Sequence, residues 1–137
     1  MQTKVLVVGV VRKDNAVLMR KKPDGSAPYK ETWYLFGGET DGSRVPDDAI
    51  RETVLFQAGI TIAVGQKFSW DTEIKHDLDG IEKYFVYLDV LCDYSGGELI
   101  PAPGIEKLEW VSTEDLHQYD IVPPSRILFQ KLGYLPE

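Results

Sequence analysis

The chain has 137 residues, of which 43% are hydrophobic and 27% charged, and its formal net charge is −7. This length and composition predict one globular domain over residues 1–137 and exclude a disordered chain. The negative charge, without a long Lys/Arg run, argues against a nucleic-acid partner. The apolar N-terminal run is too short to span a membrane, and a lone cysteine, Cys92, cannot form an intramolecular disulfide, which suits a reducing cytoplasm.

The first part of the chain predicts a β-hairpin and a short third strand. Residues 3–12 and 16–22 are rich in β-branched and apolar residues and are separated by a short polar turn, Lys13–Asn15. Residues 23–31 contain two prolines and a glycine and predict a loop. The strand TWYLF follows and ends at a pair of glycines. The longest basic cluster, Arg20–Lys22, is expected to be a solvated strand end.

A helix is predicted over residues 45–58. Pro46 fits the first helical position, where a missing N–H is tolerated, and two aspartates in the first turn complement the helix dipole. Gly59 then ends the helix. The apolar side chains repeat at helical spacing and form one face: Ala49, Ile50, Val54 and Ala58.

The second half of the chain predicts more strands and then two short helices. Residues 60–74 and 81–94 read as strands joined by a polar turn, and LEWVS reads as the last strand. Ser112 opens a short helix through a capping-box pattern, and Pro123 opens another. This order predicts an α+β fold, with a mixed sheet flanked by helices.

The stretch from Gly38 to Ile60 resembles the signature of the Nudix (MutT-like) hydrolase family. Gly38, Val54, Gly59 and Ile60 match that signature without gaps, and VLFQAGI resembles the family's VLEEAGI. The hairpin, the ETWYLFGG segment, LEWVSTEDL and the C-terminal tail follow the family's order, so the resemblance covers nearly the whole chain. It implies a mixed β-sheet sandwiched between α-helices and hydrolysis of a pyrophosphate bond in a nucleoside diphosphate-linked compound, with Mg²⁺ or Mn²⁺.

The signature is degenerate at its metal-binding positions. Its conserved glutamates fall here on Arg44, Thr53, Phe56 and Gln57. Mg²⁺ prefers hard oxygen ligands, chiefly carboxylates, and helix positions 53, 56 and 57 lie within about 100° of one another. A second register keeps Arg51–Glu52 as the signature's Arg–Glu pair, but its insertion would rotate later side chains by about 100°. The ungapped register is therefore preferred, and it leaves this face without a carboxylate.

Several residues could replace the missing chemistry. Glu52 lies one helix step from the ligand face and could reach a metal from the rim, and Gln57 offers a neutral oxygen. The resemblance implies that a general base can come from the acidic turn between Trp70 and Glu82, and a histidine has a suitable unperturbed pKa. The alternative for this turn is an inert, solvated loop. The candidates there are Glu73, His76 and Asp77.

A second group of residues could hold a phosphate-containing ligand. Arg44 could grip phosphate oxygens without a metal, or it could pair with Glu52 or Asp47 on the surface. Tyr29 lies in the loop before the box and could stack on a base or sugar. The loop around the glycines supplies the remaining candidates: Gly37, Gly38 and Glu39.

Three functions remain open at this stage. The chain could be a hydrolase that uses fewer or unusual metal ligands. It could bind a nucleotide or phosphate ligand without turnover and need no metal. It could also be a scaffold for a protein partner, or a homodimer without a small ligand. The lost glutamates argue against the standard metal chemistry, while the retained glycines and helix slightly favour the hydrolase class. The substrate is not encoded in the box.

Overall fold

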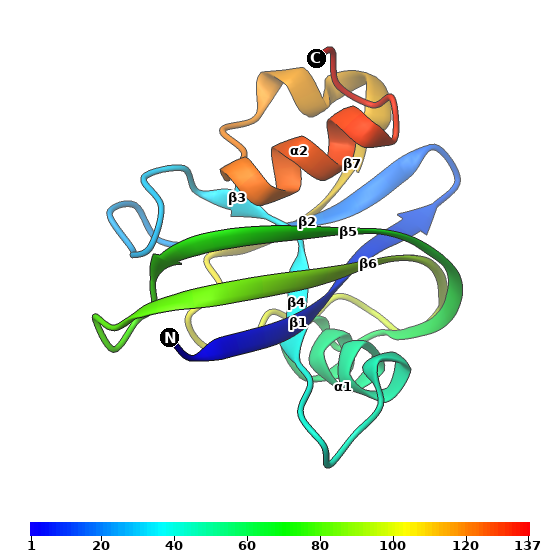
Figure 1. The fold of residues 1–137 in the computed structure, drawn as a ribbon. Helices are drawn as coiled ribbons and strands as arrows, with labels where there is room; N and C mark the ends of the chain where they lie inside the picture. The colour runs from blue at the N-terminus through cyan, green and yellow to red at the C-terminus, as the bar shows by residue number, and fades with distance from the viewer.

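The computed structural model describes all 137 residues and contains one mixed sheet between two α-helices (Figure 1). The predicted α+β class is confirmed. The elements in chain order are β1 (Thr3–Lys13), β2 (Ala16–Lys21), β3 (Trp33–Tyr34), β4 (Phe36–Glu39), α1 (Pro46–Ala58), β5 (Thr61–His76), β6 (Glu82–Gly96), β7 (Lys107–Ser112), the 3₁₀ helix η1 (Thr113–Gln118) and α2 (Pro123–Lys131). Neither α-helix is long and apolar enough to cross a membrane.

The sheet has seven strands built around β1. Its main path runs β3-β2-β1-β6-β5, while β4 pairs with β1 and β7 pairs with β2. The β1–β6 pair is parallel, and the other strand pairs are antiparallel. Residues 6–9 of β1 pair with β4, whereas its last two residues pair with β2. One strand therefore carries both the hairpin and the segment that leads into α1.

The two faces of the sheet pack against different helices. Val7 and Val11 of β1 are fully buried in a cluster with Ile50 and Val54 of α1. Val10, on the opposite face, joins a second cluster that includes residues of α2. This division follows from the alternation of side chains along a strand.

The element boundaries agree closely with the sequence. The predicted helix 45–58 is observed as Pro46–Ala58, and Gly59 follows it at φ 77°. The basic cluster is where the prediction was wrong: Arg20 is 8% exposed and Lys22 is 6% exposed. Strand alternation turns both toward the interior, while Lys21 between them points outward.

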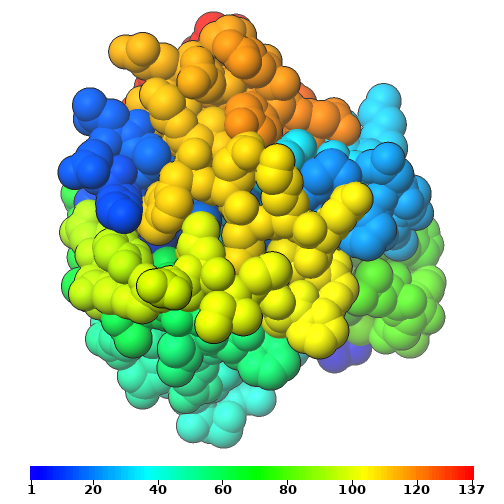
Figure 2. Space-filling model, turned by 180° about the vertical axis from the view of Figure 1, so that it is seen from behind, coloured from blue at the N-terminus to red at the C-terminus, as the bar shows by residue number.

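The segment after β6 closes the back of the molecule, where Figure 2 shows it in yellow between the α1 side and the α2 side. The Ile100 N–H donates to the Ala58 carbonyl at 2.8 Å, and the Ala102 N–H donates to the Gln57 carbonyl at 3.0 Å. These bonds satisfy carbonyls that the end of a helix would otherwise leave unpaired. The segment therefore fixes the C-terminal end of α1 against the sheet.

Gly38→Ala is expected to destabilise the protein, because α1 lies directly against this position. An added Cβ would overlap the Thr53 hydroxyl and lie 2.9 Å from the Ala49 carbonyl oxygen. Overpacking of this kind costs about 1–3 kcal/mol. The measurement is the free energy of unfolding by urea. Gly37→Ala is the matched control, since its nearest neighbour would be 3.6 Å away; equal losses in both variants would contradict this packing.

Candidate functional site

A cavity of about 430 Å³ lies on the α2 side of the sheet. Its floor is formed by alternate residues of β1, β6 and β5, and its walls come from β2, β3, β4 and the start of α2. The loop after β2 adds Tyr29 to the lining. Five aromatic side chains take part, which makes the cavity suited to a flat ring: Tyr29, Tyr34, Phe36, Phe85 and Tyr87.

The strand register sets the order of residues across the floor. Val8 pairs with Asp89 of β6 and with Gly37 of β4. Two residues earlier on β1, Leu6 pairs with Tyr87 and with Glu39. The segment that begins the Nudix-like box therefore forms the wall beside this part of the cavity floor.

Arg20 of β2 forms part of the cavity wall and is a buried charge whose hydrogen-bond partners are neutral. Its Nε donates to the Leu35 carbonyl at 3.0 Å, its Nη1 donates to the Gln57 side-chain oxygen, and its guanidinium lies 3.9 Å from the centre of the Tyr34 ring. It has no Asp or Glu oxygen within 4.0 Å. Burial lowers the pKa of Arg20 to about 10, so the group stays protonated at neutral pH.

Two tyrosines and a lysine that line the cavity form a hydrogen-bonded cluster with the neighbouring Glu73. The hydroxyls of Tyr29 and Tyr87 donate to Glu73 Oε1 at 2.5 and 2.6 Å. Lys75 donates to the same hydroxyls at 2.7 and 3.0 Å. Burial lowers the pKa of Lys75, and the Glu73 carboxylate opposes this shift. The structure thus brings the predicted residues Tyr29 and Glu73 together.

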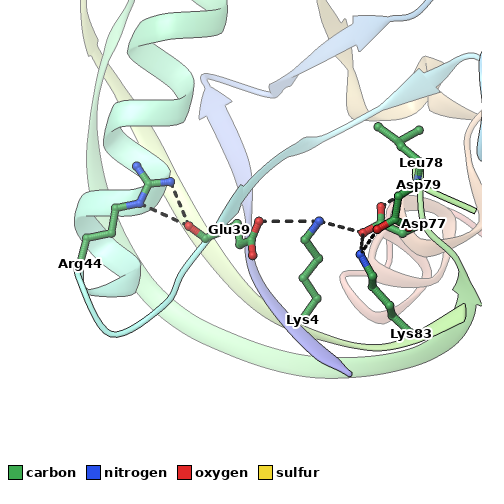
Figure 3. A network of polar contacts seen from close by, with 7 residues as sticks. All are labelled: Lys4, Glu39, Arg44, Asp77, Leu78, Asp79 and Lys83. Atoms are coloured by element: carbon green, nitrogen blue, oxygen red, sulfur yellow. Dashed lines mark hydrogen bonds and ion pairs between the residues drawn. The ribbon is translucent and has the colours of Figure 1, made fainter. Parts of the chain in front are cut away.

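A second polar network lies at the N-terminal end of β1 (Figure 3). The Lys4 ammonium is 2.8 Å from Asp77 and 3.7 Å from Glu39. Asp77 also accepts from Lys83 at 2.8 Å. The hydrogen bond from Lys4, followed by that from Lys83, lowers the pKa of Asp77. The Asp77 carboxylate is therefore ionised, and it joins Lys4 of β1 to Lys83 of β6.

Arg44 and Glu52 lie outside the cavity and pair with each other. The Arg44 guanidinium bonds to the Glu52 carboxylate and donates through Nη2 to the Glu39 carbonyl at 2.9 Å. Of the two alternatives left open for Arg44, the surface ion pair is the one observed. Neither residue is among those that line the cavity.

The helix positions that correspond to the signature do not fit a divalent metal. Phe56 is 77% exposed and has no ligating atom. The Gln57 side-chain oxygen is already occupied by Arg20, and Thr53 lies near Gly38. No group of three or more His, Cys, Asp or Glu side chains is placed to hold a metal ion. The signature positions of α1 therefore lack the carboxylate-rich donor set that Mg²⁺ requires.

Besides Arg44 and Glu52, four predicted residues are not among those that line the cavity: Gly38, Gln57, Glu73 and His76. His76 is exposed, because it alternates with Lys75 and points to the other side of β5. Gly38 faces α1, whereas Gly37 lines the cavity. The sequence reasoning missed six charged lining residues: Lys4, Arg20, Lys22, Asp71, Lys75 and Asp89.

Asp89 is a buried carboxyl group on the cavity floor and is 4% exposed. Its Oδ2 accepts from the Ser69 hydroxyl at 2.9 Å, and no protein group donates to its other oxygen. Burial raises the pKa of Asp89 to about 6, and the nearby Asp71 carboxylate also raises it. The ionised form is therefore held in an unfavourable environment.

Curated proteins similar to this chain match it along almost its full length, although no family model matches the sequence. The nucleoside triphosphatase NudI of Escherichia fergusonii is 25% identical over 98% of this chain and 100% of its own length. The same protein from Klebsiella pneumoniae subsp. pneumoniae is 23% identical with the same coverage. The chain is therefore similar in sequence to NudI proteins along nearly its whole length.

Solved Nudix structures share the fold. A MutT Nudix hydrolase from Burkholderia pseudomallei superposes with a TM-score of 0.73 at 23% identity, covering 96% of this chain and 99% of that one. A Nudix hydrolase from Nitrosomonas europaea superposes with a TM-score of 0.75 at 15% identity, covering 97% and 91%. The Nudix sheet, with helices on both sides, is thus confirmed for this chain.

Asp89→Asn is expected to stabilise the protein at pH 7.5 and not at pH 4. The folded-state pKa is raised above the ordinary value of 3.8 to about 6, so the Asp89 contribution to stability is present below pH 4 and is lost as the pH rises through 6. A shift of this size corresponds to at most about 3 kcal/mol. The measurement is the free energy of unfolding at both pH values. A stability difference that does not change with pH would contradict the assignment.

Proposed function

We propose that the cavity is the ligand site of this chain and that its ligand is a nucleoside di- or triphosphate, or a related compound with a pyrophosphate linkage. The observation that carries this proposal is the combination of aromatic rings with ammonium and guanidinium groups in one cavity of about 430 Å³. Rings can stack on a base, and buried cations can hold phosphate oxygens. The cavity also borders the box segment at Gly37 and Glu39.

The reaction that the Nudix resemblance implies is hydrolysis of the pyrophosphate linkage. A divalent metal, when bound, would neutralise charge on the phosphoryl oxygens. The side chains at positions 44, 53, 56 and 57 do not fit that role, which favours weak turnover with little dependence on metal. The relatives named nucleoside triphosphatase favour retention of some hydrolysis.

Binding without turnover is the second candidate, and a specific observation favours it. The two acidic residues that the sequence predicted as general bases are engaged: Glu73 by two tyrosines and Asp77 by two lysines. A general base needs a free oxygen within hydrogen-bond reach of the attacking water. The predicted scaffold or homodimer role needs neither the cavity nor its charges.

A thermal-shift and turnover panel is expected to show nucleotide binding with slow or no hydrolysis. The panel contains nucleoside di- and triphosphates and nucleotide sugars, each with Mg²⁺, Mn²⁺ or EDTA. A ligand at about 100 times its Kd stabilises the fold by about 2.7 kcal/mol. The unphosphorylated nucleosides are the matched controls and should stabilise much less. If no nucleotide stabilises the protein, the proposed site is contradicted. Fast metal-dependent release of phosphate would contradict the conclusion that the signature positions of α1 do not fit a divalent metal.

A further inference from the structure

We propose that the Arg20 guanidinium binds a phosphate group of the ligand directly, so that the ligand binds without a divalent metal. This inference rests on the proposed nucleoside phosphate site and identifies the group that recognises the phosphate. A residue of β2 would then neutralise phosphate charge, which in the Nudix signature is done by a metal held by helix carboxylates. Gln57, at a metal-binding position of that signature, holds the guanidinium instead.

The first argument is the absence of a counter-charge. Buried charges in proteins are normally paired, because removing an ion from water costs several kcal/mol. Arg20 is 8% exposed, and its partners are a carbonyl, an amide oxygen and two aromatic rings, all of them neutral. A ligand phosphate in the cavity would supply the missing anion.

The second argument is the set of donors that remains free. A guanidinium has five N–H donors, and the protein uses one at Nε and one at Nη1. Three donors therefore have no protein partner, in a side chain that lines the cavity. The planar fork of Arg matches two phosphate oxygens at once.

The other cations of the cavity are already engaged. Lys4 is 2.8 Å from Asp77, and Lys75 is 3.3 Å from Glu73, so each has a carboxylate beside it. Lys22 donates to the carbonyls of Ser26 and Tyr29, both at 2.6 Å, and so holds the loop after β2. Arg20 is the cavity cation that combines burial, free donors and the lack of an acidic neighbour.

The amide at position 57 is what keeps this charge available. Gln57 accepts from Arg20 through a neutral oxygen, which orients the guanidinium without cancelling its charge. A glutamate here would form a buried ion pair with Arg20 and compete with a phosphate for the same donors. The side chain that departs from the signature thus acts as a positioning group for Arg20.

The direct test is titration calorimetry of the full chain with inorganic pyrophosphate and with ADP, in EDTA. The wild-type chain is expected to bind both. Arg20→Met is expected to weaken binding by about tenfold or more, because a charge-assisted hydrogen bond to phosphate is lost. Lys21→Met is the matched control: Lys21 is the next residue of β2, points outward, and pairs with Glu106 at 2.6 Å. The affinity of the Lys21→Met variant for both probes should stay within about twofold of wild type, since the Lys21 side chain contacts no cavity group.

A second variant keeps the test decisive if Arg20→Met fails to fold. Gln57→Glu preserves the shape of the side chain and places a carboxylate beside Arg20. It is expected to weaken pyrophosphate binding in EDTA by about tenfold, as the new ion pair occupies the guanidinium. Far-UV circular dichroism establishes that each variant is folded. Affinity in EDTA that is unchanged in either folded variant would overturn the proposal.

The outcomes separate this inference from the proposed function. If the wild-type chain binds ADP and pyrophosphate only when Mg²⁺ is present, the nucleotide site stands and the metal-free role of Arg20 is overturned. If neither probe nor any nucleotide binds under any condition, the proposed function fails together with the inference. Binding in EDTA that depends on Arg20 and on an uncharged residue 57 supports both.

Discussion

The parallel pairing of β1 with β6 is the constraint on which the rest of the molecule depends. Ten consecutive residue pairs fix its register, from Thr3 with Tyr84 to Arg12 with Asp93. Because side chains alternate across a sheet, this register sends Val7 into the core beneath α1 and Lys4 toward the cavity. A slip by one residue would exchange the two sets and bury ammonium groups against α1. The core and the site are therefore two faces of one strand pair.

The cavity holds more charge than a packed interior would accept. Lys75, Glu73 and two tyrosines satisfy one another through short hydrogen bonds, which is the usual condition for keeping polar groups inside. Arg20 and Asp89 are different, because each has unused hydrogen-bonding capacity. Burial lowers the pKa of Arg20 and raises the pKa of Asp89, so in both cases it disfavours the charged form. Stability is thus given up at these positions, as is common where a site is arranged for a ligand.

Local patterns in the sequence predicted the elements well, and the site much less completely. Pro46, the two aspartates after it and Gly59 define α1 by local chemistry, so its boundaries could be placed within one residue. The alternation along β5 could also have placed Lys75 on the same side as Glu73. The pairing of Tyr29 with Glu73 joins residues 44 apart, and only the sheet brings them together. Arg20 was missed because a basic strand end is ordinarily solvated.

The burial of Arg20 also changes what the degenerate box means. Considered alone, Gln57 is a weakened metal ligand, and Phe56 is a lost one. Beside Arg20, the amide of Gln57 is a better partner than a carboxylate, because it leaves the positive charge free for the cavity. Part of the positive charge that a divalent metal would bring to the proposed phosphate ligand is then already present in the chain. Restoring a carboxylate at position 57 would oppose that charge before it could recruit a metal, so positions 20 and 57 act as one unit.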